Sequence, residues 1–241
     1  MEIVQRWAVQ GGEDKQRMKT PGRITLESIS GVVTSSNFAL SLFGFALASI
    51  YKPAGQVGGD LFQIIPIANG LVMVALGDVS GKGMPAAMTV ALLVGTLRTL
   101  AHYTQKPSEI LAAMNQRMLA RSSGGFTTCL VLTVSAAGTL TAANAGHIAP
   151  YVNGRELTLA NGLPLGLSAH EQYAESVFSL AADEQLTIMT DGVVEARATD
   201  GELLGFDRVK AMTTQSADSI VQAAQDFGQE DDITVMTLRL A

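Results

Sequence analysis

Cysteine and histidine are scarce in this sequence, which holds one cysteine and three histidines among 241 residues. The cysteine, Cys129, lies in an apolar run. A free cysteine in such a run usually behaves as a small buried hydrophobe, so we expect no catalytic thiolate. No two histidines stand one helical turn apart, which is the spacing of helical zinc sites. A single cysteine is typical of a reducing compartment, and we expect a cytoplasmic protein.

Basic residues are also few, with 16 lysines and arginines against 22 acidic residues and a net charge of −6. Because nucleic-acid binding requires clustered cations, we expect no nucleic-acid partner. Residues 1–20 lack the uninterrupted apolar core of a signal peptide. Residues 28–50 carry no charge and are long enough to cross a bilayer. They are rich in serine, however, and end in a predicted strand, so we expect no membrane association.

Aspartates, by contrast, occur in four distinctive contexts. Asp60 and Asp78 each follow a glycine, Asp191 precedes one, and Asp231 and Asp232 form a pair. A glycine beside a carboxylate leaves room for a close approach to an ion. A single Asp-Gly pair is more simply explained as a turn, but four contexts at strand boundaries favour a shared site. Ligands that are all oxygens suit Mg²⁺ or Mn²⁺ rather than zinc.

Predicted strands bring these aspartates toward one edge. One apolar run ends just before Asp78, and another ends just before Asp191. An alternating strand begins directly after the Asp231–Asp232 pair, and a fourth strand leads toward Asp60. In chain order the four strands are residues 46–51, 71–76, 186–190 and 233–240. We therefore expect four strand boundaries to converge on one site.

The other predicted elements form a frame around this site. Pro85 marks the first turn of a helix that is apolar on nearly every face, so we expect it to be buried on more than one side. Asn153-Gly154 is a strong tight-hairpin signal, and successive hairpins favour antiparallel sheets. The helix that contains Pro85 is predicted over residues 84–101, a second helix begins at residue 107, and a third covers residues 217–227. Strands are predicted over residues 129–134 and 140–143, and a flap over residues 195–206.

Six segments of the chain resemble the SpoIIE-type bacterial serine phosphatases, which belong to the metal-dependent type 2C protein phosphatase superfamily. They occur in the family's order, with compatible gaps, from about Phe45 to the C-terminus. The segments are YKPAGQVGGD (51–60), GDVSGKG (77–83), ANAGH (143–147), GLPLG (162–166), TDGVVEAR (190–197) and DDIT (231–234). The length and the 47% hydrophobic content suit one compact domain, which we assign to residues 45–241. Residues 1–44 are then an N-terminal extension of unknown role.

The resemblance implies an αββα sandwich, in which two antiparallel sheets flanked by helices hold two Mn²⁺ or Mg²⁺ ions at one end. Two such ions activate a water for in-line attack at phosphorus and neutralise the phosphoryl oxygens, so no protein nucleophile is needed. Carried over by position, Asp78 bridges both ions and the Val79 carbonyl adds a ligand. Asp191 and Asp231 hold the first ion and Asp60 belongs to the second. Asp232 stands where eukaryotic relatives usually carry asparagine, so Asp231 is the preferred ligand of that pair.

Two further residues are candidates for contact with substrate. Lys82 precedes the helix that begins near Pro85, so it either holds the substrate phosphate or is a solvated loop lysine. His147 lies in a family segment and either assists the leaving group as a general acid or has a structural role in a turn beside the site.

Two other motifs are excluded. The chain has Leu76 and Gly83 where a phosphate-binding loop needs glycine and serine or threonine. Residues 58–62 are similar to the signature of diguanylate cyclases, whose pattern does not supply the other aspartate contexts.

The sequence thus predicts a metal-dependent protein phosphatase that acts on phosphoserine or phosphothreonine. By resemblance, the substrate is a phosphorylated regulatory protein of the anti-anti-sigma type, and an activating partner protein is expected as well. Two alternatives stay open: a catalytically weak phosphatase-like binding module of a partner-switching pathway, and a hydrolase of small phosphoesters. Four intact acidic contexts favour an enzyme, because clustered carboxylates repel one another without a metal.

Overall fold

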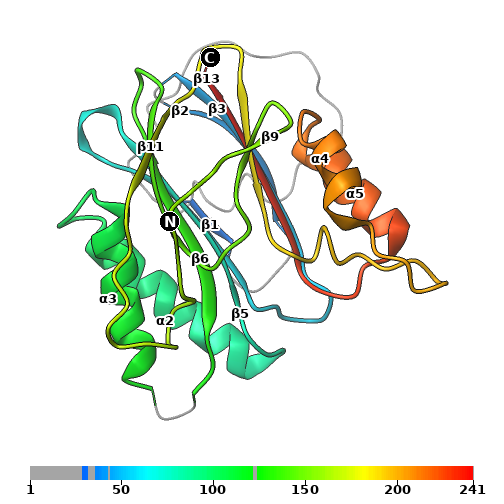
Figure 1. Cartoon of the computed structure of the whole chain (residues 1–241), viewed down its shortest axis with the longest axis horizontal. Coiled ribbons are helices and arrows are strands. Elements are labelled where there is room, and N and C mark those ends of the chain that lie inside the picture. Colours follow the sequence, from blue (N-terminus) through cyan, green and yellow to red (C-terminus); the bar gives the residue numbers. More distant parts are fainter. Residues whose placement is uncertain (1–28, 32–35, 43, 122–123, 241) are drawn as a thin grey trace, which may run out of the picture.

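The computed structural model describes residues 29–31, 36–42, 44–121 and 124–240. Two sheets stack face to face, with helices α2 and α3 on one outer side and α4 and α5 on the other (Figure 1). This arrangement confirms the predicted αββα sandwich.

The first sheet has the order β1-β4-β5-β6-β7-β10, and β11 also pairs with β7. All its pairings are antiparallel except that of β10 with β7. Its register places Asp60, the first residue of β4, directly opposite Asp78. The strands are β1 (Ile29–Gly31), β4 (Asp60–Pro66), β5 (Val72–Val79), β6 (Thr127–Val134), β7 (Thr139–Ala145), β10 (Asn161–Gly162) and β11 (Ser176–Ser179).

The second sheet is antiparallel throughout, with the order β2-β3-β13-β12-β8-β9. Asn153 and Gly154 connect β8 to β9 with φ angles of 46° and 79°. Two positive φ angles in a two-residue connection define a tight hairpin turn, as the sequence predicted. The strands are β2 (Ser36–Leu42), β3 (Phe45–Lys52), β8 (Tyr151–Val152), β9 (Arg155–Glu156), β12 (Gln185–Met189) and β13 (Ile233–Leu240).

Each sheet buries its outer face under two helices. α2 (Met84–Leu100) and α3 (Pro107–Leu119) pack on the first sheet, and both begin with a proline in the first turn. α4 (Gly205–Met212) and α5 (Ala217–Gly228) pack on the second, and the Ser216 hydroxyl accepts a hydrogen bond from Ser219 N to cap α5. A third apolar layer lies between the sheets and includes Phe62, Leu76 and Met236.

Several predicted elements differ from the structure at their boundaries. Asp78 lies within β5 rather than past its end, because its pairing with β4 and β6 continues to the last residues of the strand. α4 was not predicted, and the expected flap over residues 195–206 runs into it after an Arg197–Leu203 bridge. Cys129 is fully buried in β6, and burial raises the pKa of its thiol to about 12, as a core cysteine requires.

Residues upstream of Phe45 take part in both sheets. β1 pairs with β4 and β2 pairs with β3, so the two sheets include strands upstream of the boundary predicted at Phe45. The uncharged stretch 28–50 supplies β1, β2 and most of β3 among its described residues. Within the part of the chain that the structure describes, no helix combines the length and the apolar character needed to span a membrane.

Candidate metal centre

Aspartates from both sheets gather at one end of the sandwich. Asp60 and Asp78 face each other across β4 and β5. Asp191 follows β12 and the Asp231–Asp232 pair precedes β13, and the charges of these three act on Asp78. The convergence expected from the strand boundaries is therefore present.

Burial makes this cluster electrostatically unfavourable by itself. Burial, followed by the charges of Asp191 and Asp231, raises the pKa of Asp78 to about 7. Burial and the charge of Asp78 raise the pKa of Asp60 well above its ordinary value. Burial and Glu195 raise the pKa of Asp191. A nearby cation would offset both the free-energy cost of burying these charges and their mutual repulsion. Because the donors are all oxygens, the cluster fits Mg²⁺ or Mn²⁺.

The Asp60 carboxylate is held from the opposite sheet. Its Oδ2 accepts hydrogen bonds from the Thr190 hydroxyl at 2.8 Å and from the Thr234 hydroxyl at 2.6 Å. All three residues are almost fully buried. These hydroxyls oppose the rise in the pKa of Asp60, because they stabilise its charged form.

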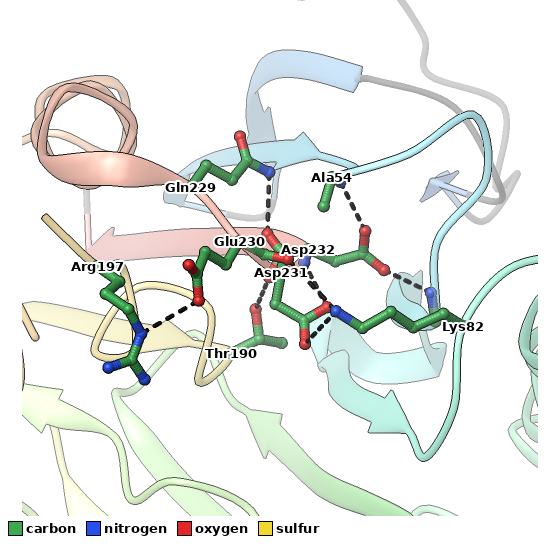
Figure 2. A network of polar contacts seen from close by, with 9 residues as sticks. Ala54, Lys82, Thr190, Arg197, Gln229, Glu230, Asp231 and Asp232 are labelled. Atoms are coloured by element: carbon green, nitrogen blue, oxygen red, sulfur yellow. Dashed lines mark hydrogen bonds and ion pairs between the residues drawn. The ribbon is translucent and has the colours of Figure 1, made fainter. Parts of the chain in front are cut away.

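Asp232 and its neighbour Asp231 have different environments (Figure 2). Asp232 Oδ1 accepts a hydrogen bond from Ala54 N at 2.8 Å and its Oδ2 accepts one from Gly59 N at 2.5 Å. A Cβ at Gly58 would lie within 2.2 Å of Asp232 Oδ2, so glycine is needed there. Both carboxylate oxygens therefore hold the loop between β3 and β4.

Asp231 lies at the exposed rim, and its side chain is 47% accessible. Its Oδ1 accepts a hydrogen bond from the backbone of Asp232, and its Oδ2 is 3.6 Å from Lys82 Nζ. Lys82 also approaches the Glu230 carbonyl at 3.4 Å (Figure 2). These residues line a cavity of about 500 Å³ together with residues 54–58, 83 and 84.

The Val79 carbonyl reaches the site beside a glycine. A Cβ at Gly59 would lie 2.9 Å from Val79 O and 3.4 Å from Asp78 Oδ1. Gly192 is constrained in the same way, because a Cβ there would lie 2.0 Å from Asp232 O. The glycines beside the aspartates are thus required by close packing within the site.

His147 has contacts that fit a structural role. Its Nδ1 is 2.9 Å from the Thr128 hydroxyl, and its backbone N–H and C=O bond to the Asn144 side chain. Burial lowers the pKa of the imidazole to about 4, and a backbone contact with Met189 opposes that shift. The ring is therefore neutral near pH 7. In the described residues no contact joins it to the aspartates, and it lines a different cavity, of about 370 Å³.

The present side-chain positions do not yet enclose an ion. Within the described ranges, no three histidine, cysteine, aspartate or glutamate side chains are placed so that they could hold a metal as they stand. Ion binding would require these carboxylates to converge further.

Four residues of this centre were not assigned a role from the sequence. Thr190, Thr234 and Glu195 lie inside the recognised segments, so their position in TDGVVEAR and DDIT was the available signal. Tyr51 is buried, and among the described residues its hydroxyl has no hydrogen-bond partner. Burial and the charge of Asp232 raise its pKa, so it remains protonated.

Comparisons with known proteins bear on the family and the fold of this chain. The phosphoserine phosphatase RsbU of Bacillus subtilis (strain 168) is 27% identical over 215 residues, a match that covers 80% of this chain and 62% of RsbU. The chain thus spans about three fifths of that relative. The phosphatase domain of SpoIIE from Bacillus subtilis superposes with a TM-score of 0.71 at 15% identity, over 85% of this chain and 71% of that structure. RsbX in complex with magnesium superposes with a TM-score of 0.67 at 16% identity, over 86% of this chain and 100% of RsbX.

The two structural likenesses establish the fold, which is that of the type 2C phosphatase domains. A model of the family described as Stage II sporulation protein E (SpoIIE) matches residues 68–241, which is most of the chain. This chain therefore belongs to the SpoIIE family.

Proposed function

We propose that this chain is a Mn²⁺- or Mg²⁺-dependent protein phosphatase that hydrolyses phosphoserine or phosphothreonine on a bacterial regulatory protein. The observation that carries the proposal is the pairing of buried Asp60 with half-buried Asp78, which Asp191 and Asp231 join at one end of the sandwich. A partly buried cluster of like charges is costly, and a divalent cation removes that cost. Membership of the SpoIIE family and the likeness to RsbU support the same activity.

The contacts of the paired aspartates bear on the ligand assignment. We assign Asp78 to both ions, with the Val79 carbonyl beside it, Asp191 and Asp231 to the first ion, and Asp60 to the second. Asp232 is left out because both its oxygens already accept backbone hydrogen bonds. The Asp231 carboxylate lies at the rim, and its charged partner is the accessible ammonium group of Lys82. Asp231 is therefore freer than Asp232 to bind an ion.

The chemistry follows from this arrangement. When bound, two such ions lower the pKa of a water and neutralise the phosphoryl oxygens. Lys82 lies at the rim with a 73% accessible side chain, where its ammonium group can attract a phosphate and exchange its contact with Asp231 for one with substrate. The cavity of about 500 Å³ beside it is large enough to receive a phosphorylated side chain and its neighbours.

We assign the substrate to the class of phosphorylated anti-anti-sigma regulators, and we expect a separate activating protein and a cytoplasmic location. The support is the relationship to RsbU, which is itself named a phosphoserine phosphatase. The second candidate is a phosphatase-like binding module with weak turnover. It is favoured by one observation, that the described carboxylates do not enclose an ion as they stand.

A titration of phosphate release with Mn²⁺ separates these candidates. The substrate is a phosphoserine regulator protein of the anti-anti-sigma type, and a chelator sample sets the background. Metal-dependent release supports the phosphatase. Tight binding of the phosphoprotein without release at any Mn²⁺ concentration supports the binding module. A small aryl phosphate provides the matched comparison, because a protein phosphatase is expected to favour the phosphoprotein by orders of magnitude in kcat/KM.

A further inference from the structure

The hydroxyls of Thr190 and Thr234 converge on one oxygen of Asp60. We propose that these two threonines are positioning residues that restrict Asp60 to binding a metal through its other oxygen, Oδ1. The inference rests on the proposed function, because it takes Asp60 to be a metal ligand.

The two hydroxyls reach Asp60 across the space between the sheets. Thr190 directly follows β12 and Thr234 is the second residue of β13, whereas Asp60 begins β4 of the other sheet. The backbone N–H of Thr190 donates to the carbonyl of Thr234 at 3.0 Å, so the two threonines lie side by side. Strand pairing in one sheet therefore sets the position of a carboxylate in the other.

The direction of the Thr190 hydroxyl is also fixed. Its oxygen accepts a hydrogen bond from Thr234 N at 2.9 Å, so its proton is free to point elsewhere. The proton has two acceptors in reach, Asp60 Oδ2 at 2.8 Å and the Asp232 carbonyl at 3.5 Å. The shorter contact is to a carboxylate, which is the stronger acceptor. Thr190 is thus set to donate to Asp60.

Saturation of one oxygen gives the functional consequence. A carboxylate oxygen has about two lone-pair sites, and Asp60 Oδ2 already receives two hydroxyl donors. Both threonines are 0% exposed, so water does not compete for these two contacts. An ion that approached Oδ2 would have to displace these buried hydrogen bonds, whereas in the described part of the chain we find no hydrogen bond to Oδ1. Asp60 is therefore expected to bind with one oxygen and in one rotamer.

Packing alone does not account for threonine at these positions. Valine has nearly the same shape, and β13 uses it at Val235 next to Thr234. A buried hydroxyl is costly unless it is hydrogen-bonded, and both hydroxyls donate their hydrogen bond to Asp60. A hydroxyl-dependent effect on metal binding is what distinguishes positioning from packing.

The test compares Thr190→Val and Thr234→Val with Thr190→Ser and Thr234→Ser in the full chain. Thr237→Val is the matched control, because Thr237 is a buried threonine of the same strand outside this contact. The probe is Mn²⁺ alone, measured by calorimetry and by electron paramagnetic resonance without substrate. Loss of a residue that orients a ligand typically weakens metal affinity by roughly 10- to 100-fold, and we expect this for each valine variant. The serine variants are expected to restore affinity and the control to leave it unchanged.

Affinity in the valine variants equal to that of the wild type would overturn the inference, while phosphate release by the wild type would leave the proposed function standing. A wild-type chain that binds no Mn²⁺ would overturn both. If a valine variant does not fold, a crystal structure of the Mn²⁺-loaded wild type decides the question. Ligation through Oδ1, with both hydroxyls still on Oδ2, supports the inference, and ligation through Oδ2 or through both oxygens refutes it.

Discussion

The two halves of this centre are built differently. Asp60 and Asp78 lie on paired strands, and Asp60 is 2% exposed and held by two threonine hydroxyls. Asp231 and Lys82 lie in loops at the rim, where their side chains are 47% and 73% accessible. Strand register sets the buried half before any ligand arrives, whereas the rim half can rearrange. We therefore expect the buried half to control metal binding and the rim to control the encounter with substrate.

Removal of the charge from the buried half has the largest expected effect. Asp78→Asn should lower phosphate release to the level of the chelator background, because it removes the carboxylate assigned to both ions. Asparagine is nearly the same size as aspartate, and burial and the neighbouring carboxylates disfavour a negative charge at position 78. The fold should therefore remain intact when that charge is removed. Phosphate-release assays and circular dichroism check the two parts. Asp218→Asn, at an exposed position in the first turn of α5, is the control. A folded Asp78→Asn variant that retains activity would refute the two-metal assignment.

The paired aspartates provide the next comparison. Asp231→Asn should reduce Mn²⁺-dependent activity more than Asp232→Asn, because only Asp231 is assigned to an ion. Asp232→Asn instead leaves one of two backbone donors, at Ala54 or Gly59, without an acceptor, since an amide has one oxygen. A buried donor left unpaired costs about 1–3 kcal/mol, so this variant should mainly lose stability. Activity and thermal unfolding are measured on both variants, and the reverse ranking in activity would exchange the two roles.

The stability of the metal-free chain should depend on pH in a specific direction. Folding raises the pKa of Asp78 from its ordinary value of 3.8 to about 7. Between these values the folded chain binds more protons than the unfolded chain, so the free energy of unfolding falls as pH rises. Mn²⁺ should reduce or reverse this fall, because it stabilises the ionised carboxylates. His147 contributes the opposite slope below pH 6.5, because folding lowers its pKa to about 4. Melting temperatures from pH 6.5 to pH 8, with chelator and with Mn²⁺, therefore test the prediction. A metal-free melting temperature that rises over this range would contradict it.

The smallest expected effect is at the rim. Lys82→Ala should raise KM for the phosphoprotein severalfold and leave kcat and Mn²⁺ affinity close to those of the wild type. Exposed ion pairs contribute about 0–1 kcal/mol, so stability should change little. Lys106→Ala is the matched control, because Lys106 forms an exposed pair with Glu109 away from the aspartates. If Lys82→Ala changes Mn²⁺ affinity and not KM, then Lys82 belongs to the metal half of the site.

The sequence predicted the parts of the site that depend on local pattern. Strand boundaries placed Asp78 and Asp191 at one end of the fold, and β13 has the predicted bounds, because alternation and turn residues are local signals. The contact of Thr190 and Thr234 with Asp60 joins residues more than a hundred positions apart, and it depends on how the sheets stack. No pattern within a segment carries that information.

The same limit applies to His147 and to the helices. The sequence left two roles open for His147, and its contact with Thr128, a residue of a neighbouring strand, favours the structural role. α4 was not predicted because it is only eight residues long, with Val209 as its one buried residue, so its apolar pattern extends over about two turns.

The most direct test of the account is to count the Mn²⁺ ions bound per chain above pH 7, where Asp78 is ionised. Equilibrium dialysis or calorimetry on the wild type and on Asp78→Asn gives this number. The account predicts two ions for the wild type and loss of both in the variant. Binding of no ion to a folded wild-type chain, or binding that Asp78→Asn leaves unchanged, would contradict it.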